Sequence, residues 1–178
     1  QDMQKAAETV TIPETPIRQA SSLYQKELLP WQHFYPDVFQ IRIDFSTLRI
    51  PERKAGFDRL LVIAEGMTPN SLFDKATELF QTWRYTKDLD TIISDRKTDH
   101  DYAVWVRDRI EADEEMKNIS ADQIKNQGIT TNTIEERFLY ELMYFRETGK
   151  HLDIANWTLC AGSRDPDGNV PNVNLNDS

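Results

Sequence analysis

Residues 133–149 constrain the fold most, because they carry a complete set of signals for one amphipathic helix. Thr133 is suited to cap the helix N-terminus, and Glu136, three residues later, completes a capping box. Gly149 supplies the left-handed exit that commonly ends a helix. Between them an apolar ridge recurs at helical spacing: Ile134, Phe138, Leu142 and Phe145. We therefore expect a helix that lays one face on the core.

Two segments earlier in the chain have the patterns of strands. Residues 39–50 alternate between apolar and polar side chains, which predicts a half-buried strand. Residues 60–63 form a short continuous apolar run, which predicts a central strand of the sheet. We expect these two strands to pair as a hairpin with a long loop.

The remaining elements alternate helices with strands. Thr68 and Pro69 begin a second predicted helix, and its apolar stripe, expected to lie on the sheet, consists of Leu72, Phe73, Ala76, Leu79, Phe80 and Trp83. Ser120 caps a short helix, and residues 102–106 and 154–160 read as strands. This order predicts an α+β fold with helices packed on a small mixed or antiparallel sheet.

The domain organisation follows from the length of 178 residues, which suits one domain. Residues 1–16 are polar with two prolines and predict a flexible N-terminal segment. Residues 17–162 form the predicted α+β domain, opening with a short helix that ends at Pro30. Residues 163–178 form a polar C-terminal loop or the start of a truncated variable region.

The aromatic residues within 31–36 are interpreted as a packed corner rather than a platform for ligand stacking.

Charge and composition narrow the range of partners. The net charge of −9 argues against binding to nucleic acid or to anionic lipid, since phosphate binding needs clustered Lys and Arg. No apolar run approaches the length of about 18–20 residues that a bilayer requires, so we expect no membrane partner. Cys160 is the only cysteine, which excludes an intrachain disulfide and fits a cytoplasmic protein.

Two clusters of charged residues contain side chains that could bind a metal ion or act in catalysis. If residues 107–115 were helical, Asp108, Glu111 and Glu115 would share a face at a spacing that suits a hard cation. His100 lies between Asp99 and Asp101, although neighbours in sequence usually point apart. A solvated surface is the preferred interpretation of the acidic run. A metal-dependent enzyme, nuclease-like or nucleotidyltransferase-like, remains the alternative function, and no catalytic residue, metal ligand or cofactor is assigned.

The sequence after Ser163 resembles the first half of a calcium loop. Oxygen-bearing side chains stand at alternate positions in Ser163, Asp165 and Asp167, and Gly168 marks the sharp bend. The twelfth position should carry a bidentate Glu but is Asn174. We therefore predict a type I turn stiffened by Asx hydrogen bonds rather than a calcium site.

Gly162, Ser163 and the two following aspartates also resemble the opening motif of minimal nucleotidyltransferases. In that family a helical turn separates the Gly-Ser pair from the two metal-binding acids. No residues are left here for that turn, so we reject this interpretation and keep it only as the enzyme alternative.

Six segments resemble an uncharacterised protein family of candidate-phylum bacteria with a variable C-terminal region. The later ones read FRETGKHLD, NWTLCAGSR and DGNVP, at 145–153, 156–164 and 167–171. The earlier ones are residues 30–36, 51–60 and 102–109. The variable region of that family is similar to that of the target proteins of diversity-generating retroelements. Such targets usually end in a C-type-lectin-like fold, and the resemblance implies a longer Trp- and Gly-bearing segment than the one present after Arg164.

These observations together predict a non-enzymatic binding or display protein. Its polar C-terminal segment would be presented to an unidentified protein or small-molecule ligand. The expected ligand-binding residues are Arg164, Asp165, Asp167, Asn169, Asn172 and Asn174.

Overall fold

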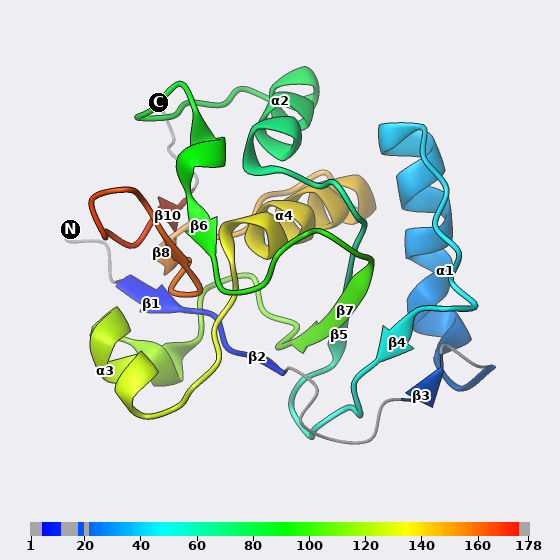
Figure 1. The fold of residues 1–178 in the computed structure, drawn as a ribbon, viewed down its shortest axis with the longest axis horizontal. Coiled ribbons are helices and arrows are strands. Elements are labelled where there is room, and N and C mark those ends of the chain that lie inside the picture. The colour runs from blue at the N-terminus through cyan, green and yellow to red at the C-terminus, as the bar shows by residue number, and fades with distance from the viewer. Residues whose placement is uncertain (1–4, 12–17, 20–21, 175–178) are drawn as a thin grey trace. The chain divides into compact units, whose positions relative to one another are not determined.

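The computed structural model describes residues 5–11, 18–19 and 22–174 (Figure 1). The chain forms two compact units. The first unit comprises Gln1–Thr9, Thr68–Lys97 and Arg109–Ser178. The second unit comprises Val10–Met67 and Thr98–Asp108. Helices pack with small mixed and antiparallel sheets, which confirms the predicted α+β fold class.

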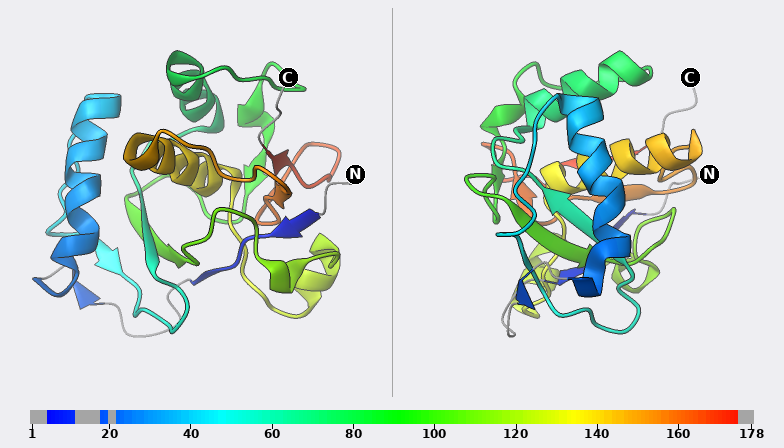
Figure 2. Two further views of the ribbon diagram at one scale, coloured as in Figure 1. Left: turned by 180° about the vertical axis from the view of Figure 1, so that it is seen from behind. Right: turned by 90° about the vertical axis from the view of Figure 1, so that its right-hand side faces the viewer.

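The second unit is built on a three-stranded antiparallel sheet in the order β2-β7-β5. Its strands are β2 (Val10–Thr11), β7 (Tyr102–Val106) and β5 (Arg59–Ile63). A separate two-stranded ladder joins β3 (Arg18–Gln19) to β4 (Arg49–Ile50). Helix α1 (Gln25–Phe34) packs along β5 and continues into a π-helical turn at Tyr35–Phe39 (Figure 2).

Aromatic side chains of α1 and of the π-helical turn lie against the free edge of β5. The indole Nε1 of Trp31 donates to the carbonyl of Leu60 at 3.0 Å. The hydroxyl of Tyr35 donates to the carbonyl of Val62 and accepts the N–H of Ala64 at 3.0 Å. These groups stand where a neighbouring strand would pair, and they satisfy the outward carbonyls of Leu60 and Val62 and the N–H of Ala64. The interpretation of residues 31–36 as a packed corner is confirmed.

The strand expected over residues 39–50 is wrong, apart from β4 at its end. Gln40 adopts a left-handed conformation with φ of 56° and ends the π-helical turn. The carboxylate of Asp44 then accepts the N–H of Ser46 at 3.0 Å, which forms a local turn instead of an extended strand. β4 pairs with β3 rather than with β5, so the predicted hairpin is also wrong.

Two other expectations for the second unit need correction. The run 60–63 lies in β5, which is an edge strand, and β7 is the central one. Helix α1 does not end at Pro30 but continues through it to Phe34.

The first unit contains a three-stranded sheet in the order β1-β8-β10, with β1 parallel and β10 antiparallel to β8. Its strands are β1 (Lys5–Ala7), β8 (Trp157–Leu159) and β10 (Asn172–Val173). A second ladder pairs β6 (Ile93–Ser94) with β9 (Ser163–Arg164). The α-helices are α2 (Pro69–Leu79), α3 (Ala121–Asn126) and α4 (Ile134–Thr148), and short 3₁₀ turns occupy Leu89–Thr91 and Glu114–Met116.

Helix α4 has the predicted boundaries. Thr133 accepts the N–H of Glu136, the Glu136 side chain accepts the N–H of Thr133, and Gly149 takes the left-handed exit. Ile134 and Cys160 form a buried cluster with Leu89 and Ile92. Phe73, Phe138 and Val173 pack against this cluster.

Helix α2 begins at the predicted cap but packs on α4 rather than on the sheet (Figure 1). Phe73 lies against Phe138, and Phe80 lies edge-on to Phe145, with ring centroids 4.9 Å apart. Trp83, at the end of the predicted apolar stripe, is 64% exposed. The stripe is therefore shorter than its spacing indicates, because only part of it meets α4.

Residues 5–11 of the expected flexible N-terminal segment contain β1 and β2, and its residues 1–4 and 12–16 lie outside the described part of the chain. The expected C-terminal loop contains β9 and β10, and its residues 175–178 also lie outside that part. Among the described residues, no helix is long and apolar enough to cross a membrane.

The cover over β5 predicts the effect of removing one hydroxyl. Tyr35→Phe keeps the ring but leaves the Val62 carbonyl and the Ala64 N–H buried without this partner. We expect the free energy of unfolding to fall by about 1–3 kcal/mol in urea denaturation. The control Tyr85→Phe removes a hydroxyl from a residue that is 89% exposed and should be neutral. Equal stability of Tyr35→Phe and wild type would show that the hydroxyl does not support the edge.

Candidate functional site

The base of the predicted recognition segment is Gly162, which lies against the backbone just before α4. Its N–H donates to the carbonyl of Asn132 at 2.9 Å. A Cβ added to Gly162 would stand 2.8 Å from the carbonyl oxygens of both Thr131 and Asn132. Since these obstacles are backbone atoms, only glycine permits this approach.

Ser163 continues the attachment and is 1% exposed. Its hydroxyl oxygen accepts the N–H of Ile134 at 2.9 Å, which satisfies a first-turn donor of α4. The same oxygen lies 2.7 Å from the hydroxyl of Ser94, which in turn donates to the Glu135 carboxylate at 2.7 Å. Burial raises the pKa of Glu135, and the hydrogen bond from Ser94 opposes that shift.

Arg164, the first of the six predicted ligand-binding residues, folds back on its own segment. Its Nη1 donates to the carbonyl of Ala161 at 2.7 Å and to that of Ser163 at 2.8 Å. The side chain is therefore half-buried and contributes to holding the β9 turn together.

Asp165 organises the turn that follows. Its Oδ1 accepts the N–H groups of Asp167 at 2.9 Å and Asn169 at 2.8 Å, and its Oδ2 accepts Nδ2 of Asn169 at 3.1 Å. The Asn169 backbone, ahead of the other donors, lowers the pKa of the Asp165 carboxyl. Gly168 takes φ of 85° at the bend. The predicted turn stiffened by Asx hydrogen bonds is confirmed, and Asp165 is the residue that supplies them through both oxygens of its carboxylate.

Beyond this turn the segment joins the sheet of the first unit through β10. Val173 packs against the cluster of Leu89, Ile92, Ile134 and Cys160, and Asn172 is exposed. The structure thus brings three exposed side chains of the predicted set together between residues 165 and 174: Asp167, Asn169 and Asn172. Arg164 and Asp165 hold the segment in shape, and Asn174 is half-buried.

The acids considered for metal binding are not gathered into one site. Asp108 pairs with Arg59 at 3.1 Å in the second unit. Residues 107–113 are not helical and Glu115 lies in the 3₁₀ turn, so the condition under which Asp108, Glu111 and Glu115 would share a helix face is not met. Among the described residues, no group of three His, Cys, Asp or Glu side chains is placed to hold a metal ion.

The other two acids of that run serve the first unit. The Glu111 carboxylate accepts the N–H of Ala155 at 3.1 Å and Nδ2 of Asn156 at 3.0 Å. The Glu115 carboxylate takes both Nη groups of Arg109, at 2.6 and 2.9 Å. The two acids that flank His100 also make separate contacts. Asp99 bonds to the exposed His100, whereas Asp101 accepts the N–H of Glu65.

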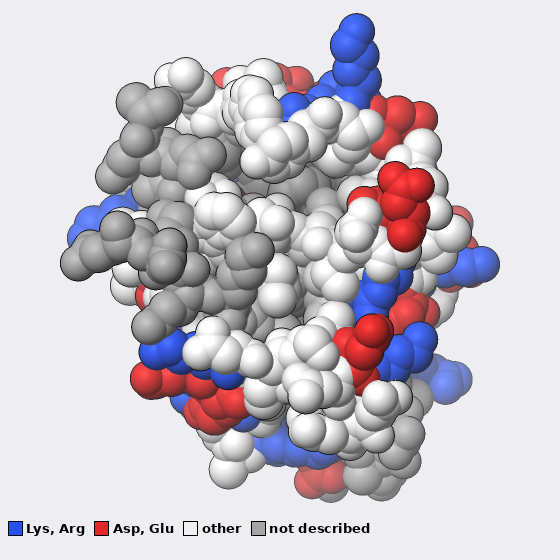
Figure 3. All heavy atoms as spheres, turned by 90° about the vertical axis from the view of Figure 1, so that its left-hand side faces the viewer, with Lys and Arg blue, Asp and Glu red and all other residues white. Residues whose placement is uncertain are grey.

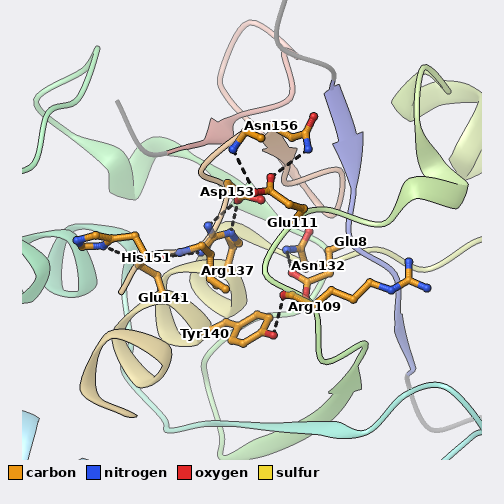
Figure 4. Close-up of polar contacts among 12 residues, drawn as sticks. Glu8, Arg109, Glu111, Asn132, Arg137, Tyr140, Glu141, His151, Asp153 and Asn156 are labelled. Carbon is orange, nitrogen blue, oxygen red and sulfur yellow. Dashed lines mark hydrogen bonds and ion pairs between the residues drawn. The ribbon is translucent and has the colours of Figure 1, made fainter. Parts of the chain in front are cut away.

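A buried ionic cluster under α4 was not anticipated from the sequence (Figure 4). Arg137 is 2% exposed and donates through Nε and Nη2 to one oxygen of Asp153, at 3.0 and 2.6 Å. Glu141 lies 3.5 Å from Nη1 of Arg137 and also accepts the N–H of Leu152 and contacts His151. Burial alone would lower the pKa of Arg137, but the Asp153 and Glu141 carboxylates raise it above its ordinary value.

Glu8 belongs to the same buried region and is linked to Asn132 twice. Its backbone carbonyl accepts the N–H of Asn132 at 2.8 Å, and its carboxylate accepts Nδ2 of Asn132 at 2.8 Å (Figure 4). Burial, reinforced by the charges of Asp113 and Asp153, raises the pKa of Glu8 well above 4.5, although Arg137 opposes the shift. No spacing pattern could have identified this cluster, because its members come from distant parts of the chain.

Comparison of the chain with protein-family models, with curated proteins and with solved structures finds no match. The assignment of a function therefore depends on the geometry above.

The raised pKa of Glu8 predicts a pH dependence of stability. Because the folded chain binds this proton more tightly, the stabilisation is complete below about pH 4.5 and is lost as pH rises through the folded-state pKa. We expect the free energy of unfolding of Glu8→Gln, which stays neutral, to rise relative to that of wild type as pH increases above about 4.5. Denaturant unfolding at several pH values measures this difference. The control Glu52→Gln, at an exposed position, should show no such trend, and a trend of the opposite sign for Glu8→Gln would contradict the account.

Proposed function

We propose that this chain is a non-enzymatic binding protein that displays the polar segment 165–174 to a ligand. The observation that carries the proposal is the change in burial along this segment. Gly162 and Ser163 are buried and hydrogen-bonded to the start of α4, whereas residues 166–169 are exposed. A short exposed segment on a fixed base is the arrangement that positions recognition side chains.

The internal hydrogen bonds of the segment also support binding. Asp165 closes the turn through three bonds to Asp167 and Asn169, so the turn keeps its shape without a partner. A preorganised loop loses less conformational entropy when it binds, which favours affinity. The exposed amide of Asn172 can both donate and accept hydrogen bonds, and the amide of Asn169, whose Nδ2 donates to Asp165, still offers its oxygen as an acceptor. These groups suit a polar protein surface or small molecule.

The resemblance to retroelement target proteins agrees with this proposal. It implies that sequence variation falls after Arg164, and the exposed residues begin immediately beyond Asp165. A display protein of this kind needs varied positions that contribute little to folding. Exposed positions meet that requirement, since substitutions at such places usually change stability by less than about 0.5 kcal/mol.

The test is a library of surface-displayed chains with Asp167, Asn169 and Asn172 randomised, screened with lysozyme as the probe. We expect most clones to stay resistant to protease and the library to give specific binders. Asn172→Ala alone should change the free energy of unfolding by less than about 0.5 kcal/mol.

The matched control is a library randomised at three exposed positions of α3: Asp122, Lys125 and Asn126. It should fold equally well but give few binders. The proposal fails if randomising the segment unfolds the chain, or if both libraries give binders at the same rate.

A further inference from the structure

Strand β10 forms one edge of the sheet β1-β8-β10. Its register is set by the N–H of Cys160, which donates to the carbonyl of Pro171 at 2.8 Å, and by the pairing of Asn172 with Leu159. In an antiparallel ladder hydrogen-bonded and non-hydrogen-bonded pairs alternate, so Asn172 occupies a non-hydrogen-bonded position. The N–H and C=O of Asn172 therefore point away from β8.

These two backbone groups are available at the strand edge. Within the part of the chain that the structure describes, they have no hydrogen-bond partner. The side chain of Asn172 is exposed as well, whereas Val173 faces the buried cluster beneath. Pro171 does not block the edge, because its carbonyl is directed toward β8 and its ring replaces an N–H on that same side.

The sheet of the second unit shows how this chain closes an edge. There Trp31 and Tyr35 bond to the outward backbone groups of β5. The exposed residue at the outward position of β10 is an uncharged Asn, without the Lys or Pro that commonly protects an edge. An edge left in this form is a template for another strand.

Charge points to the kind of strand that fits. Figure 3 looks onto the side of the β9–β10 loop, and the acidic and basic side chains of the described residues lie there mostly toward the margins of an area that is neither acidic nor basic. A second copy of the chain would bring another net charge of −9 to the contact and is disfavoured by repulsion. A peptide segment with few charges would not be repelled in this way.

We propose that β10 takes up an extended, weakly charged peptide segment of a partner protein as an additional strand, through the N–H and C=O of Asn172. This inference rests on the proposed binding function and names the partner class of the same segment. The backbone pairing supplies affinity, and the exposed side chains of Asp167 and Asn169 supply selectivity.

The test separates backbone from side-chain recognition at one position. The probe is the tightest nonapeptide selected on the wild-type chain from a phage-displayed library. Asn172→Pro removes the outward N–H without removing a bond to β8, and Asn172→Ala keeps the N–H but removes the amide side chain. We expect Asn172→Pro to weaken peptide binding by about tenfold or more, and Asn172→Ala by less than about threefold.

A second measurement covers the case in which Asn172→Pro fails to fold. Single N-methyl groups placed along the peptide should weaken binding to the wild-type chain at alternate positions only, as an edge pairing requires. Equal loss of binding with Asn172→Ala and Asn172→Pro, both of which remove the amide side chain, would overturn the strand pairing and leave the display function standing. Binding unaffected by these variants and by Asp167→Ala would overturn both. Failure to select any peptide, or a wild-type dimer that Asn172→Pro dissociates, would overturn the peptide partner.

Discussion

The contact between the 162–163 backbone and the start of α4 is the interaction on which the candidate site depends. Gly162 approaches the carbonyl of Asn132 closely enough to exclude any side chain, and Ser163 accepts the N–H of Ile134. Thr133 and Glu136 close the same helix end, and Arg96 holds Glu136 through two bonds of 2.6 and 2.8 Å. The helix terminus is thereby satisfied, and the segment that follows Ser163 leaves from a fixed point.

The buried ionic cluster supports the other side of this arrangement. Arg137 on α4 holds Asp153, whose own backbone takes the left-handed conformation with φ of 53°. A buried ion pair adds little net stability compared with apolar packing, but removing one partner costs about 3–5 kcal/mol. Here the ion pair fixes the position of the chain just before β8, because Asp153 precedes that strand. β8 is the central strand of its sheet and pairs with β10. The display segment is thus held at Ser163 and again at β10.

Sequence reasoning succeeded where the determining signals are local. The capping residues Thr133 and Glu136, the exit at Gly149 and the turn around Asp165 all act within a few residues, so they could be read from the chain. The strand predicted over residues 39–50 is wrong, because the alternating pattern there does not form a strand and Asp44 accepts the N–H of Ser46 in a local turn.

The rest of the site could not be predicted because it depends on contacts between distant segments. Ser163 is buried only when α4 and Ser94 are in place. No periodic pattern in the sequence indicates that Arg137 pairs with Asp153. The same holds for β5, whose outward carbonyls at Leu60 and Val62 accept from Trp31 and Tyr35 rather than from a neighbouring strand. Arg164 and Asp165 were expected to meet a ligand, yet their bonds within the chain show that they shape the segment.

Amide hydrogen exchange followed by NMR tests most directly where the rigid base of the displayed segment ends. The N–H of Gly162 is bonded to Asn132, and we expect it to exchange only through global unfolding. The N–H of Asn172 points away from β8, and we expect it to exchange close to the rate of an unprotected amide. Gly162 exchanging as fast as Asn172 would contradict the account, because the displayed segment would then have no fixed base.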